Sequence, residues 1–592
     1  MNARPKPRVR QVNVMDAAAE FNYGSNGVIY VRSPRELGPY PAKLTERLHQ
    51  WAATAPDRVF LAQRCPGQEW RTLTYSDALA QVRSVAQALV ERRLERPLAI
   101  LSENGIDHAL LGLGCMYAGV PYAPLAPSYS LASSDLRTLR YLLAQVEPAM
   151  VFASDGLRFE RPLELAAESG AEIVTVTPAR ALQSTSFDEL TGAIPASGVD
   201  EAHACVGPDT VAKILFTSGS TGHPKGVITT QRMLCSNQEM LSTVLAFVRE
   251  DPPVLCDWLP WNHTFGGSHN FGFVLYNGGT LFIDEGKPTG PGFQATLNNL
   301  REIAPTAYFN VPKGYEMLVA ALREDAAFAR HFFSRLKILF YAAAGLNQRV
   351  WDELQEIAVE ACGEEILMVT GLGATESSPM AMATGVEGAS AGRVGLPVPG
   401  VELKLAPVET KLEARLRGPN IMPGFWRDPE MTQAAFDEEG FYKLGDALLP
   451  VDPADPLKGF RFNGRLTEDF KLSTGTWVSV GPLRENFLKW CAGAVQEVVL
   501  AAPDRDFVTA LIFPARGTLA AELRPLIEGF ASRATGISSC IRRALVVEEP
   551  PSMDAGELTE KGSVNQKAVL RNRAKLVDEL YAGSSRVIEV DI

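Results

Sequence analysis

The sequence predicts a layered α/β fold with more than one lobe, and three observations lead to this prediction. Apolar helical stretches alternate with short β-like runs from about Leu73 onward, which is typical of layers with largely parallel strands. The chain has 592 residues, and at ~150 residues per domain this length corresponds to roughly four compact units. Near Gly464 a glycine-bounded arginine and acidic residues open a shorter run of strands and helices. We therefore predict a large N-terminal domain of layered α/β subdomains and a smaller α+β C-terminal domain.

The first part of the chain is expected to alternate helices with strands. A helix is predicted over residues 75–90. Short apolar runs predict strands over residues 97–101, 150–153 and 172–177. The uncharged stretch 109–134 is long enough to raise the question of a membrane span. Because Pro121, Pro124 and Pro127 would break a helix there, we interpret it as a buried helix followed by a turn.

The middle of the chain is expected to hold the strand that leads into a functional loop. Residues 181–208 contain Ser, Gly and Pro and are interpreted as a connector. A strand is predicted over residues 211–216, and helical periodicity resumes over residues 231–248. Further along, a strand over residues 338–342 precedes a helix over residues 351–362.

The end of the chain is predicted to form the smaller domain. Residues 495–501 and 508–513 are predicted strands, and residues 529–535 and 564–581 lie near or within helices. No internal repeat is evident at a solenoid period. The predicted division is an N-terminal tail and lead-in over residues 1–40, the large domain over residues 41–465 and the small domain over residues 466–592.

Composition narrows the classes of protein to consider. The formal net charge of -12 argues against a nucleic-acid partner, which usually binds a basic domain or stripe. A hydrophobic content of 46% and a charged content of 21% are ordinary for a soluble globular protein. The eight cysteines are scattered singly without a CxxC pair, which is typical of reduced thiols and predicts a cytoplasmic location. The N-terminus lacks the apolar segment of a secretory signal, so its basic residues are interpreted as a solvated tail: Arg4, Lys6, Arg8 and Arg10.

The most informative local feature is the loop LFTSGSTGHPKGV, residues 215–227, between an apolar strand and a helix-like stretch. Its glycines allow close approach of backbone N–H groups to an anion, its hydroxyls add donors, and Lys225 adds charge. A Walker A loop, GxxxxGK(S/T), is excluded because it would need a glycine at Pro224 and a hydroxyl residue at Gly226. A flexible linker is the alternative for such a composition. The lysine and the upstream strand favour a phosphate site.

This loop resembles the signature of the adenylate-forming acyl-CoA synthetase superfamily, (S/T)SG(S/T)TGxPKG, at every position. The resemblance extends from LTYSDAL near Leu73 to the end of the chain. It implies that the protein uses ATP, Mg²⁺ and coenzyme A with a small-molecule carboxylic acid. It also implies that residues 41–465 form an AMP-binding adenylation domain and that residues 466–592 form a mobile C-terminal domain. A homodimer is a further expectation, without nucleic-acid or membrane partners.

Three further segments resemble nucleotide-binding elements of that superfamily. GLGATE resembles the YGxTE element, in which Glu376 would ligate Mg²⁺ together with Thr217, because a hard cation prefers oxygen ligands. Thr375 would contact the α-phosphate, and Leu372 replaces the usual tyrosine. YAAAGL resembles the adenine-stacking strand end, and YKLGD resembles the element whose aspartate, Asp446, accepts both ribose hydroxyls. The alternative for Glu376 is an exposed surface carboxylate.

The junction of the two predicted domains supplies the remaining contacts. Arg465 resembles a ribose-contacting arginine, with an exposed helix-cap charge as its alternative. Thr467 occupies the hinge position, and Gly475 would let the pantetheine arm pass. The resemblance places the following residues around the nucleotide and coenzyme A: Thr217, Ser218, Gly219, Ser220, Thr221, Gly222, Lys225, Ala343, Ala344, Gly345, Gly371, Leu372, Gly373, Ala374, Thr375, Asp446, Arg465 and Gly475.

The chain departs from the superfamily at the adenylating lysine. In LTEKGSVNQKAVL, Ser563 stands where that lysine is expected, with Lys561 before it and Lys567 about one helical turn beyond. Lysine has a long flexible stem, so a mobile loop could bring Lys561 to the site. The predicted catalytic residues are Lys561, His263, Thr217 and Lys225.

Longer strings, among them DWLPWNHTFGGSHNF and FKLSTGTWVSVGPLR, resemble feruloyl-CoA synthases, which are ligases of phenylpropenoic acids. This resemblance also accounts for the KGS arrangement around Lys561. An aromatic-rich wall suits a planar acid, although aromatic side chains more often serve core packing. The predicted acid-binding residues are His263, Phe265, His269, Phe271, Gly345 and Gly373.

Parts of the sequence also match other functional classes. Residues 388–392 match GxSxG, the nucleophile elbow of serine hydrolases, but that fold needs a histidine after the serine, and the last histidine is His331. An AMP sensor or scaffold homologue remains possible because Ser563 replaces the lysine. A CoA ligase of another aryl or medium-chain acid also remains open. An adenylation module that feeds a carrier protein would need an appended carrier domain, for which the sequence gives no indication.

Overall fold

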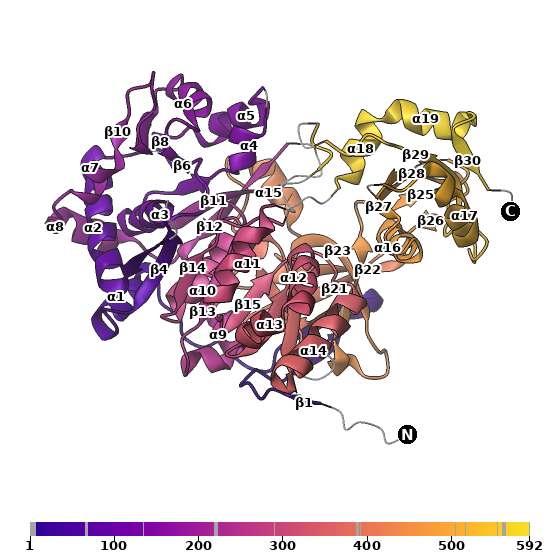
Figure 1. Ribbon diagram of the computed structural model, residues 1–592, viewed down its shortest axis with the longest axis horizontal. Coiled ribbons are helices and arrows are strands. Elements are labelled where there is room, and N and C mark those ends of the chain that lie inside the picture. Colours follow the sequence, from indigo (N-terminus) through magenta and orange to yellow (C-terminus); the bar gives the residue numbers. More distant parts are fainter. Residues whose placement is uncertain are drawn as a thin grey trace.

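The computed structural model shows a large lobe, coloured indigo to orange, beside a smaller yellow lobe (Figure 1). It describes residues 7–65, 69–133, 135–217, 223–288, 291–385, 390, 392–501, 503, 505–515, 517–552, 555–558 and 564–590. The layered α/β architecture of the large part and the smaller C-terminal part confirm the predicted fold class. In these ranges, no helix has the length and apolar character needed to cross a membrane.

The strand before the phosphate loop belongs to a seven-stranded sheet with the order β10-β9-β8-β6-β7-β11-β12. Neighbouring strands are parallel except β11 and β12, which are antiparallel. The strands are β6 (Leu98–Ile100), β7 (Tyr122–Pro124), β8 (Met150–Asp155), β9 (Glu172–Thr177), β10 (Thr185–Ser186), β11 (Val211–Thr217) and β12 (Lys225–Thr230). The helices of this region are α2 (Tyr75–Arg92), α3 (Ile106–Ala118), α4 (Pro127–Leu131), α5 (Arg137–Val146), α6 (Glu160–Ala167), α7 (Phe187–Thr191) and α8 (Ser197–Cys205).

One prediction in this region is wrong. Residues 181–208 are not a plain connector, because they form β10, α7 and α8. The Ser186 side chain and Glu189 form a reciprocal capping box, which satisfies N–H groups at the start of α7. The signal was present in the sequence as a serine followed three residues later by a glutamate.

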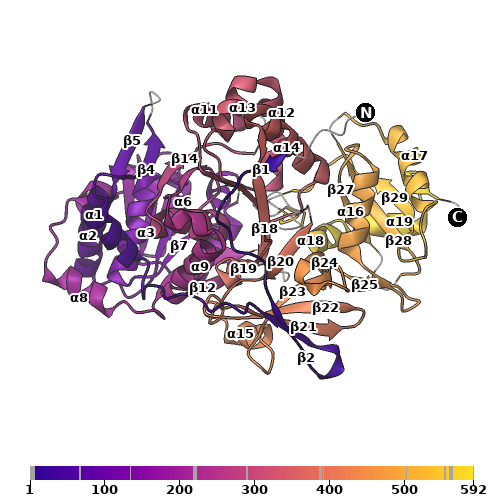
Figure 2. The ribbon, with the colours of Figure 1, turned by 90° about the horizontal axis from the view of Figure 1, so that it is seen from below.

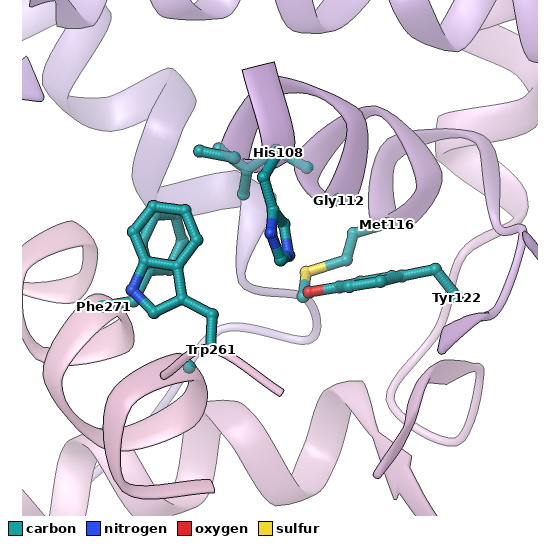
Figure 3. Close-up of a pocket in the computed structure, with 9 residues that line it drawn as sticks. His108, Gly112, Met116, Tyr122, Trp261 and Phe271 are labelled. Atoms are coloured by element: carbon teal, nitrogen blue, oxygen red, sulfur yellow. The ribbon is translucent and has the colours of Figure 1, made fainter. Parts of the chain in front are cut away.

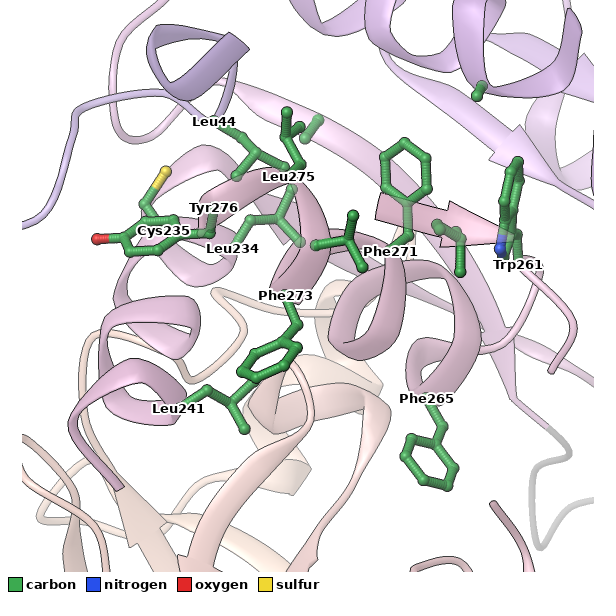
Figure 4. Packing of buried hydrophobic residues seen from close by; sticks show 14 of the residues in the cluster. Leu44, Leu234, Cys235, Leu241, Trp261, Phe265, Phe271, Phe273, Leu275 and Tyr276 are labelled. Carbon is green, nitrogen blue, oxygen red and sulfur yellow. The ribbon is translucent and has the colours of Figure 1, made fainter. Parts of the chain in front are cut away.

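A four-stranded sheet, β13-β14-β4-β5, lies in the same lobe. Its strands are β4 (Val59–Arg64), β5 (Trp70–Thr74), β13 (Val254–Asp257) and β14 (Thr280–Ile283). The accompanying helices are α1 (Thr45–Thr54), α9 (Gln231–Val244), η2 (Ala246–Arg249), the π-helix η3 (Phe265–Asn270) and α10 (Phe271–Tyr276). Figure 4 shows how the core forms here, with Leu241 of α9 beside Phe273 of α10.

The largest sheet has eleven strands in the order β15-β16-β18-β19-β20-β24-β23-β22-β21-β3-β2. Only β15, β16 and β18 are parallel, so the expectation of largely parallel strands fails for the rest of this sheet. The strands are β2 (Glu20–Tyr23), β3 (Ile29–Arg32), β15 (Ala307–Asn310), β16 (Ile338–Tyr341), β18 (Leu367–Gly373), β19 (Met380–Ala383), β20 (Arg393–Pro397), β21 (Glu402–Val408), β22 (Lys411–Arg417), β23 (Tyr442–Pro450) and β24 (Phe460–Arg465). The helices are η1 (Ser25–Gly27), α11 (Phe293–Glu302), α12 (Pro312–Glu324), α13 (Ala326–Phe333), α14 (Gln348–Cys362), η4 (Thr375–Ser377), α15 (Pro429–Ala435) and η5 (Pro456–Lys458).

The described part of the N-terminal segment is not the solvated tail that was expected. Strand β1 (Arg8–Val9) pairs with β17 (Glu364–Glu365) after α14. The guanidinium of Arg10 contacts the Glu364 carboxylate at 2.9 Å and donates to the carbonyl of Phe333 at 2.8 Å. Figure 2 shows β2 farther along this segment, at the edge of the eleven-stranded sheet near β21 and β22. Backbone pairing and a partly buried ion pair therefore fix this segment, because they satisfy groups that a tail would leave to water.

The C-terminal lobe has its own sheet and core. Its four-stranded sheet has the order β27-β28-β29-β30, beside the two-stranded pair β25-β26. The elements are β25 (Phe470–Lys471), β26 (Trp477–Val478), α16 (Val480–Trp490), β27 (Val495–Ala501), β28 (Val508–Pro514), α17 (Ala520–Ala531), β29 (Ile541–Val546), α18 (Gln566–Asn572), α19 (Ala574–Ala582) and β30 (Val587–Glu589). Phe487 and Ile527 are buried in its core. The domain boundary at residues 465 and 466 remains a prediction.

A buried ion pair joins the two lobes next to that boundary. The Lys411 ammonium on β22 contacts the Asp469 carboxylate and donates to the Asn463 carbonyl at 2.9 Å. The other Asp469 oxygen accepts from the Val480 N–H of α16 at 3.0 Å. Both side chains of the pair are 7% exposed, so the pair is largely removed from water.

Candidate active site

The described ends of the phosphate loop form a β-hairpin. Thr217 ends β11, Lys225 begins β12, and the two residues face each other across the antiparallel pair. The loop therefore joins two strands, whereas the sequence predicted a strand followed by a helix, which begins only at Gln231. The Lys225 ammonium lies 5.1 Å from the centre of the Phe425 ring. The predicted phosphate ligands between the strands lie outside the described residues: Ser218, Gly219, Ser220, Thr221 and Gly222.

The carboxyl ends of β16 and β18 supply a second group of predicted residues. Because these strands are parallel neighbours, their ends meet at one edge of the sheet. The segment after β16 is exposed and contains Ala343, Ala344 and Gly345. A Cβ on Gly371 would lie 2.2 Å from the Met382 carbonyl oxygen, so a side chain does not fit at this end of β18. A Cβ on Gly373 would likewise lie 1.7 Å from the Pro379 carbonyl oxygen.

The acidic residue predicted to bind a metal lies directly after β18. Leu372 lies within β18 and Ala374 follows it, before Thr375 and Glu376 in η4. Strand β12, which begins with Lys225, packs against η4. The structure therefore brings the phosphate hairpin and the YGxTE-like element together.

A buried carboxylate and an arginine complete this cluster. Asp446 on β23 pairs with Arg465 on β24, with the Arg465 Nε 3.5 Å from the Asp446 Oδ1. Burial raises the pKa of Asp446 to about 6, while Arg465 acts in the opposite direction and Glu376 adds to the increase. Burial also raises the pKa of Tyr442 well above its ordinary value, and the nearby Glu376 carboxylate adds to this increase. Glu376, Tyr442, Asp446 and Arg465 thus form one polar cluster beside the sheet edge.

The residues fit a magnesium ion that arrives with a nucleotide rather than one held by protein alone. Within the described ranges, no group of three His, Cys, Asp or Glu side chains could hold a metal. Glu376 is half-buried and offers a carboxylate, and Thr217 could offer a hydroxyl. Mg²⁺ is commonly bound through one or two carboxylates together with substrate phosphates and water.

Of the predicted acid-binding residues, His263 lies just before the π-helix η3, Phe265 and His269 lie on it, and Phe271 begins α10. Gly345 and Gly373 lie apart from them in the chain, after β16 and at the end of β18. The Phe265 N–H donates to the His263 Nδ1 at 3.2 Å. The rings of Phe265 and His269 lie 5.3 Å apart, and both approach the Phe340 ring of β16. Phe271 instead contacts Trp261, with ring centres 5.0 Å apart. Figure 4 shows Phe265 and Phe271 pointing away from each other.

The face of η3 that carries Gly267 borders a small cavity. Figure 3 shows His108, Met116 and Tyr122 on one side of it, with Trp261 and Phe271 on the other. Its volume of about 10 Å³ is that of roughly one water molecule. The cavity is therefore too small for a carboxylic acid, and it lies away from the Phe265 and His269 face.

Comparisons with known proteins give the family. A family model described as AMP-binding enzyme matches residues 48–426, and a model described as AMP-binding enzyme C-terminal domain matches residues 470–585. The first match alone spans more than half of the chain. The chain belongs to the AMP-binding enzyme family.

Relatives of this AMP-binding enzyme are distant. The probable CoA ligase CCL8 of Humulus lupulus is 26% identical over 431 residues, which cover 68% of this chain and 67% of that protein. The carboxylic acid reductase of Mycobacterium tuberculosis is 23% identical over 86% of this chain, which spans only 46% of that relative. The crystal structure of the anthranilate CoA ligase AuaEII with anthranoyl-AMP has a TM-score of 0.71 at 20% identity, over 92% of this chain and 99% of that chain. That likeness concerns the fold.

The predicted site residues in the C-terminal part of this AMP-binding enzyme have no described contact with the polar cluster around Glu376 and Asp446. Gly475 lies in the turn between β25 and β26 at φ +81°, where a Cβ would meet no atom of the described residues within 4 Å. Lys561 lies outside the described residues, as does Ser563. Lys567 is exposed in the first turn of α18. The choice between the two lysines therefore remains a prediction.

Sequence reasoning missed several residues that the structure brings to this region. Lys213 is buried in β11, and its ammonium donates to the Gly267 carbonyl of η3 at 2.8 Å. Its signal was a lone charge inside the apolar run VAKILFT. Asn270 and Asp257 are also buried and hydrogen-bonded beside His269, and neither carries a signal that can be read without its partner.

Proposed function

We propose that this protein is an AMP-forming acid–CoA ligase that acts on a phenylpropenoic acid such as ferulate. One observation carries the proposal: the β11–β12 hairpin with Thr217 and Lys225 packs against η4 with Glu376, and the Asp446–Arg465 pair of β23 and β24 lies beside Glu376. Family membership and the similarity to CoA ligases support the ligase activity. The aromatic acid is supported by the feruloyl-CoA synthase-like strings and by the rings along η3.

In the first step, a carboxylate oxygen of the acid attacks the α-phosphorus of ATP and pyrophosphate leaves, which gives an acyl-AMP. Lys225 and the loop hydroxyls would neutralise charge on the phosphates, and Thr375 would contact the α-phosphate. Bound Mg²⁺, held by Glu376 and Thr217, would supply Lewis-acid stabilisation of the same charge. Asp446 would accept both ribose hydroxyls and thereby orient the nucleotide.

In the second step, the thiol of coenzyme A loses its proton and its sulfur attacks the acyl carbonyl, while AMP leaves. We propose that the C-terminal part turns about Thr467 between the two steps and that the pantetheine arm passes Gly475. Lys561 would act only in the first step, because its ammonium would bridge the carboxylate and the α-phosphate.

The lysine assignment has a direct test. Replacement of Lys561 by Ala should abolish formation of acyl-AMP while thioester formation from supplied acyl-AMP remains largely intact. Lys567→Ala is the matched control, since it removes the same charge six residues farther along the chain. If only the Lys567 variant loses adenylation, the roles are reversed.

The reaction and the acid are tested together by a thioester assay that depends on coenzyme A, over cinnamic, benzoic and aliphatic acids. We expect ATP-dependent release of pyrophosphate and the highest kcat/KM with hydroxylated cinnamic acids. A strong preference for medium-chain aliphatic acids would remove the aromatic part of the proposal. Nucleotide binding without pyrophosphate release across the whole panel would favour an AMP sensor or scaffold.

A further inference from the structure

The side chain of His269 has a buried ring nitrogen without a hydrogen-bond partner among the described residues, and phenylalanine rings surround it. His269 is 1% exposed, and its ring lies 5.3 Å from the Phe265 ring, 5.3 Å from the Phe309 ring and 5.1 Å from the Phe340 ring. Its Nε2 is buried and has no hydrogen-bond partner among the described residues. A buried polar atom without a hydrogen-bond partner lowers the stability of a folded protein. A ligand that supplies the missing hydrogen bond would remove this loss of stability.

A chain of buried hydrogen bonds determines which kind of ligand group fits. The Asn270 Nδ2 donates to the Asp257 Oδ2 at 2.9 Å, and the Leu259 N–H donates to the Asp257 Oδ1 at 3.2 Å. Burial raises the pKa of Asp257 to about 7, and above that pH its carboxylate only accepts hydrogen bonds. In that state the Asn270 amide nitrogen faces Asp257 and its oxygen faces His269. The His269 Nδ1, 2.8 Å from that oxygen, must therefore carry the proton.

The remaining ring nitrogen is consequently an acceptor. Burial lowers the pKa of His269 to about 4, so the ring is neutral near pH 7. With Nδ1 protonated, Nε2 presents a lone pair and no proton. The group that completes this site must donate a hydrogen bond, so a hydroxyl fits and a methoxy group or a carbonyl does not.

The place of His269 connects it to the predicted acid-binding region. Phe309 and Phe340 are paired residues of β15 and β16, and each lies one residue before the last residue of its strand. Beyond the end of β16 lie Ala343, Ala344 and Gly345, which are predicted to contact the nucleotide and, for Gly345, also the acid. His263 precedes His269 by six residues and lies just ahead of the π-helix that carries His269.

We propose that the His269 Nε2 accepts a hydrogen bond from a para-hydroxyl group of the acid, so that the enzyme selects phenolic acids over the same acids without this hydroxyl. This inference rests on the proposed function. The carboxylate then lies toward the nucleotide beside His263, and the phenol lies against His269. Since Nε2 is covered in the chain without ligand, one of the three surrounding rings turns aside when the acid enters. Asn270 and Asp257 are positioning residues, because they act only through His269.

The test compares 4-hydroxycinnamic, cinnamic and 4-methoxycinnamic acids in the coenzyme A-dependent assay. The wild-type enzyme is expected to show a kcat/KM roughly 10- to 100-fold higher with the hydroxylated acid than with either analogue. His269→Phe should bring the three values close together, chiefly through loss with the hydroxylated acid. Asn270→Leu should reduce the same preference, because it frees the proton of the imidazole to move to Nε2.

His108→Phe is the matched control. His108 is also a buried histidine whose pKa burial lowers to about 4, but it lies on α3 beside the Figure 3 cavity. Its replacement should leave the ratio among the three acids unchanged. A purely structural role of His269 predicts an equal loss with all three acids in His269→Phe, and that result would overturn the inference.

The failure of this inference can be told apart from the failure of the proposed function. If the wild-type enzyme forms thioesters from all three cinnamic acids with equal kcat/KM, the ligase activity stands and the role of His269 is wrong. If it uses only aliphatic acids, the aromatic substrate class is wrong and the phenol contact is wrong with it.

Discussion

At the scale of single residues, the buried carboxylate of Asp446 makes nucleotide binding sensitive to pH. Burial raises the pKa of Asp446 to about 6, and only the ionised group accepts hydrogen bonds from both ribose hydroxyls. As the pH falls through 6, the neutral form grows and the affinity for AMP should fall, by up to about tenfold for each further pH unit. Titration calorimetry between pH 5 and pH 8 measures this dependence.

Asp446→Asn is the control for that prediction. It keeps the size of the side chain but has no carboxylate to titrate, so its weaker affinity for AMP should be nearly constant over the same pH range. A wild-type affinity that does not change between pH 5 and pH 8 would exclude Asp446 as the group that determines the pH dependence.

The burial of Lys213 leads to a second prediction, on how the free energy of unfolding depends on pH. Burial lowers the pKa of Lys213 from 10.5 to about 7. Between these values the unfolded chain binds a proton that the folded chain does not, so the free energy of unfolding should rise with pH. The slope is roughly 1 kcal/mol for each pH unit in this window.

Lys213→Met isolates this contribution, because methionine has a similar length and no charge. The variant should be more stable than the wild type near pH 7, and the difference should shrink as the pH approaches 10. Denaturant unfolding at pH 7, 8.5 and 10 gives the comparison. Parallel pH profiles of the two proteins would contradict the assignment.

At the scale of elements, the π-helix η3 depends on glycines that no larger residue can replace. A Cβ on Gly267 would lie 2.2 Å from the Trp261 carbonyl oxygen, and a Cβ on Gly266 would lie 2.3 Å from the Leu259 carbonyl oxygen. π-Helical turns are rare and occur frequently at functional sites. Here the turn directs His269 to the sheet and the Gly267 carbonyl to Lys213.

Gly267→Ala should therefore lower the unfolding free energy by about 1–3 kcal/mol through overpacking. It should also reduce the preference for hydroxylated acids, because the helix that carries His269 must shift. Gly198→Ala in α8 is the control, since the nearest atom to its Cβ lies 4.0 Å away. Alanine favours helix over glycine, so this control should be neutral or stabilising. If both variants were as stable as the wild type, η3 would accommodate a Cβ at Gly267 without a loss of unfolding free energy, and the prediction would be wrong.

Elements with their own periodic signal were predicted well from the sequence. Strand β27 covers residues 495–501, as predicted, because its apolar run VVLA is a local signal. The two-residue strands β1 and β17 could not be predicted, since each is defined only by a partner more than 350 residues away. In the same way, motif residues such as Asp446 could be named from sequence, whereas Asn270 acquires its role only through the tertiary contact with Asp257.

At the scale of the whole molecule, the Lys411–Asp469 pair lies across the proposed hinge. Lys411 belongs to β22, while Asp469 follows Thr467 and contacts the start of α16. The proposed rotation about Thr467 would separate the pair, and a Lys411 or Asp469 side chain left buried without its partner costs several kcal/mol. The pair therefore favours the arrangement seen in Figure 1 over a rotated one in which either charge stays buried.

Lys411→Met should shift the enzyme away from this arrangement. We expect the rates of the adenylating and thioester-forming half-reactions to change in opposite directions, because the proposed mechanism gives the C-terminal part a different position in each. Small-angle scattering of the variant should show a changed distance distribution. Lys458→Met removes a lysine that pairs with Asp452 at the exposed surface, and serves as control. Equal changes in both half-reactions would indicate a loss of folding instead.

The place of the β2–β3 hairpin has a consequence for the time at which the large lobe is completed. Residues 20–32 lie at the edge of the eleven-stranded sheet, and β3 pairs with β21, which begins at residue 402. During synthesis, β3 cannot pair with β21 until residues 402–408 have been made. At about 5–20 residues per second this delay is of the order of 20–75 s. Strand β3 can thus pair with β2 early, while its pairing with β21 forms only after most of the large lobe has been made.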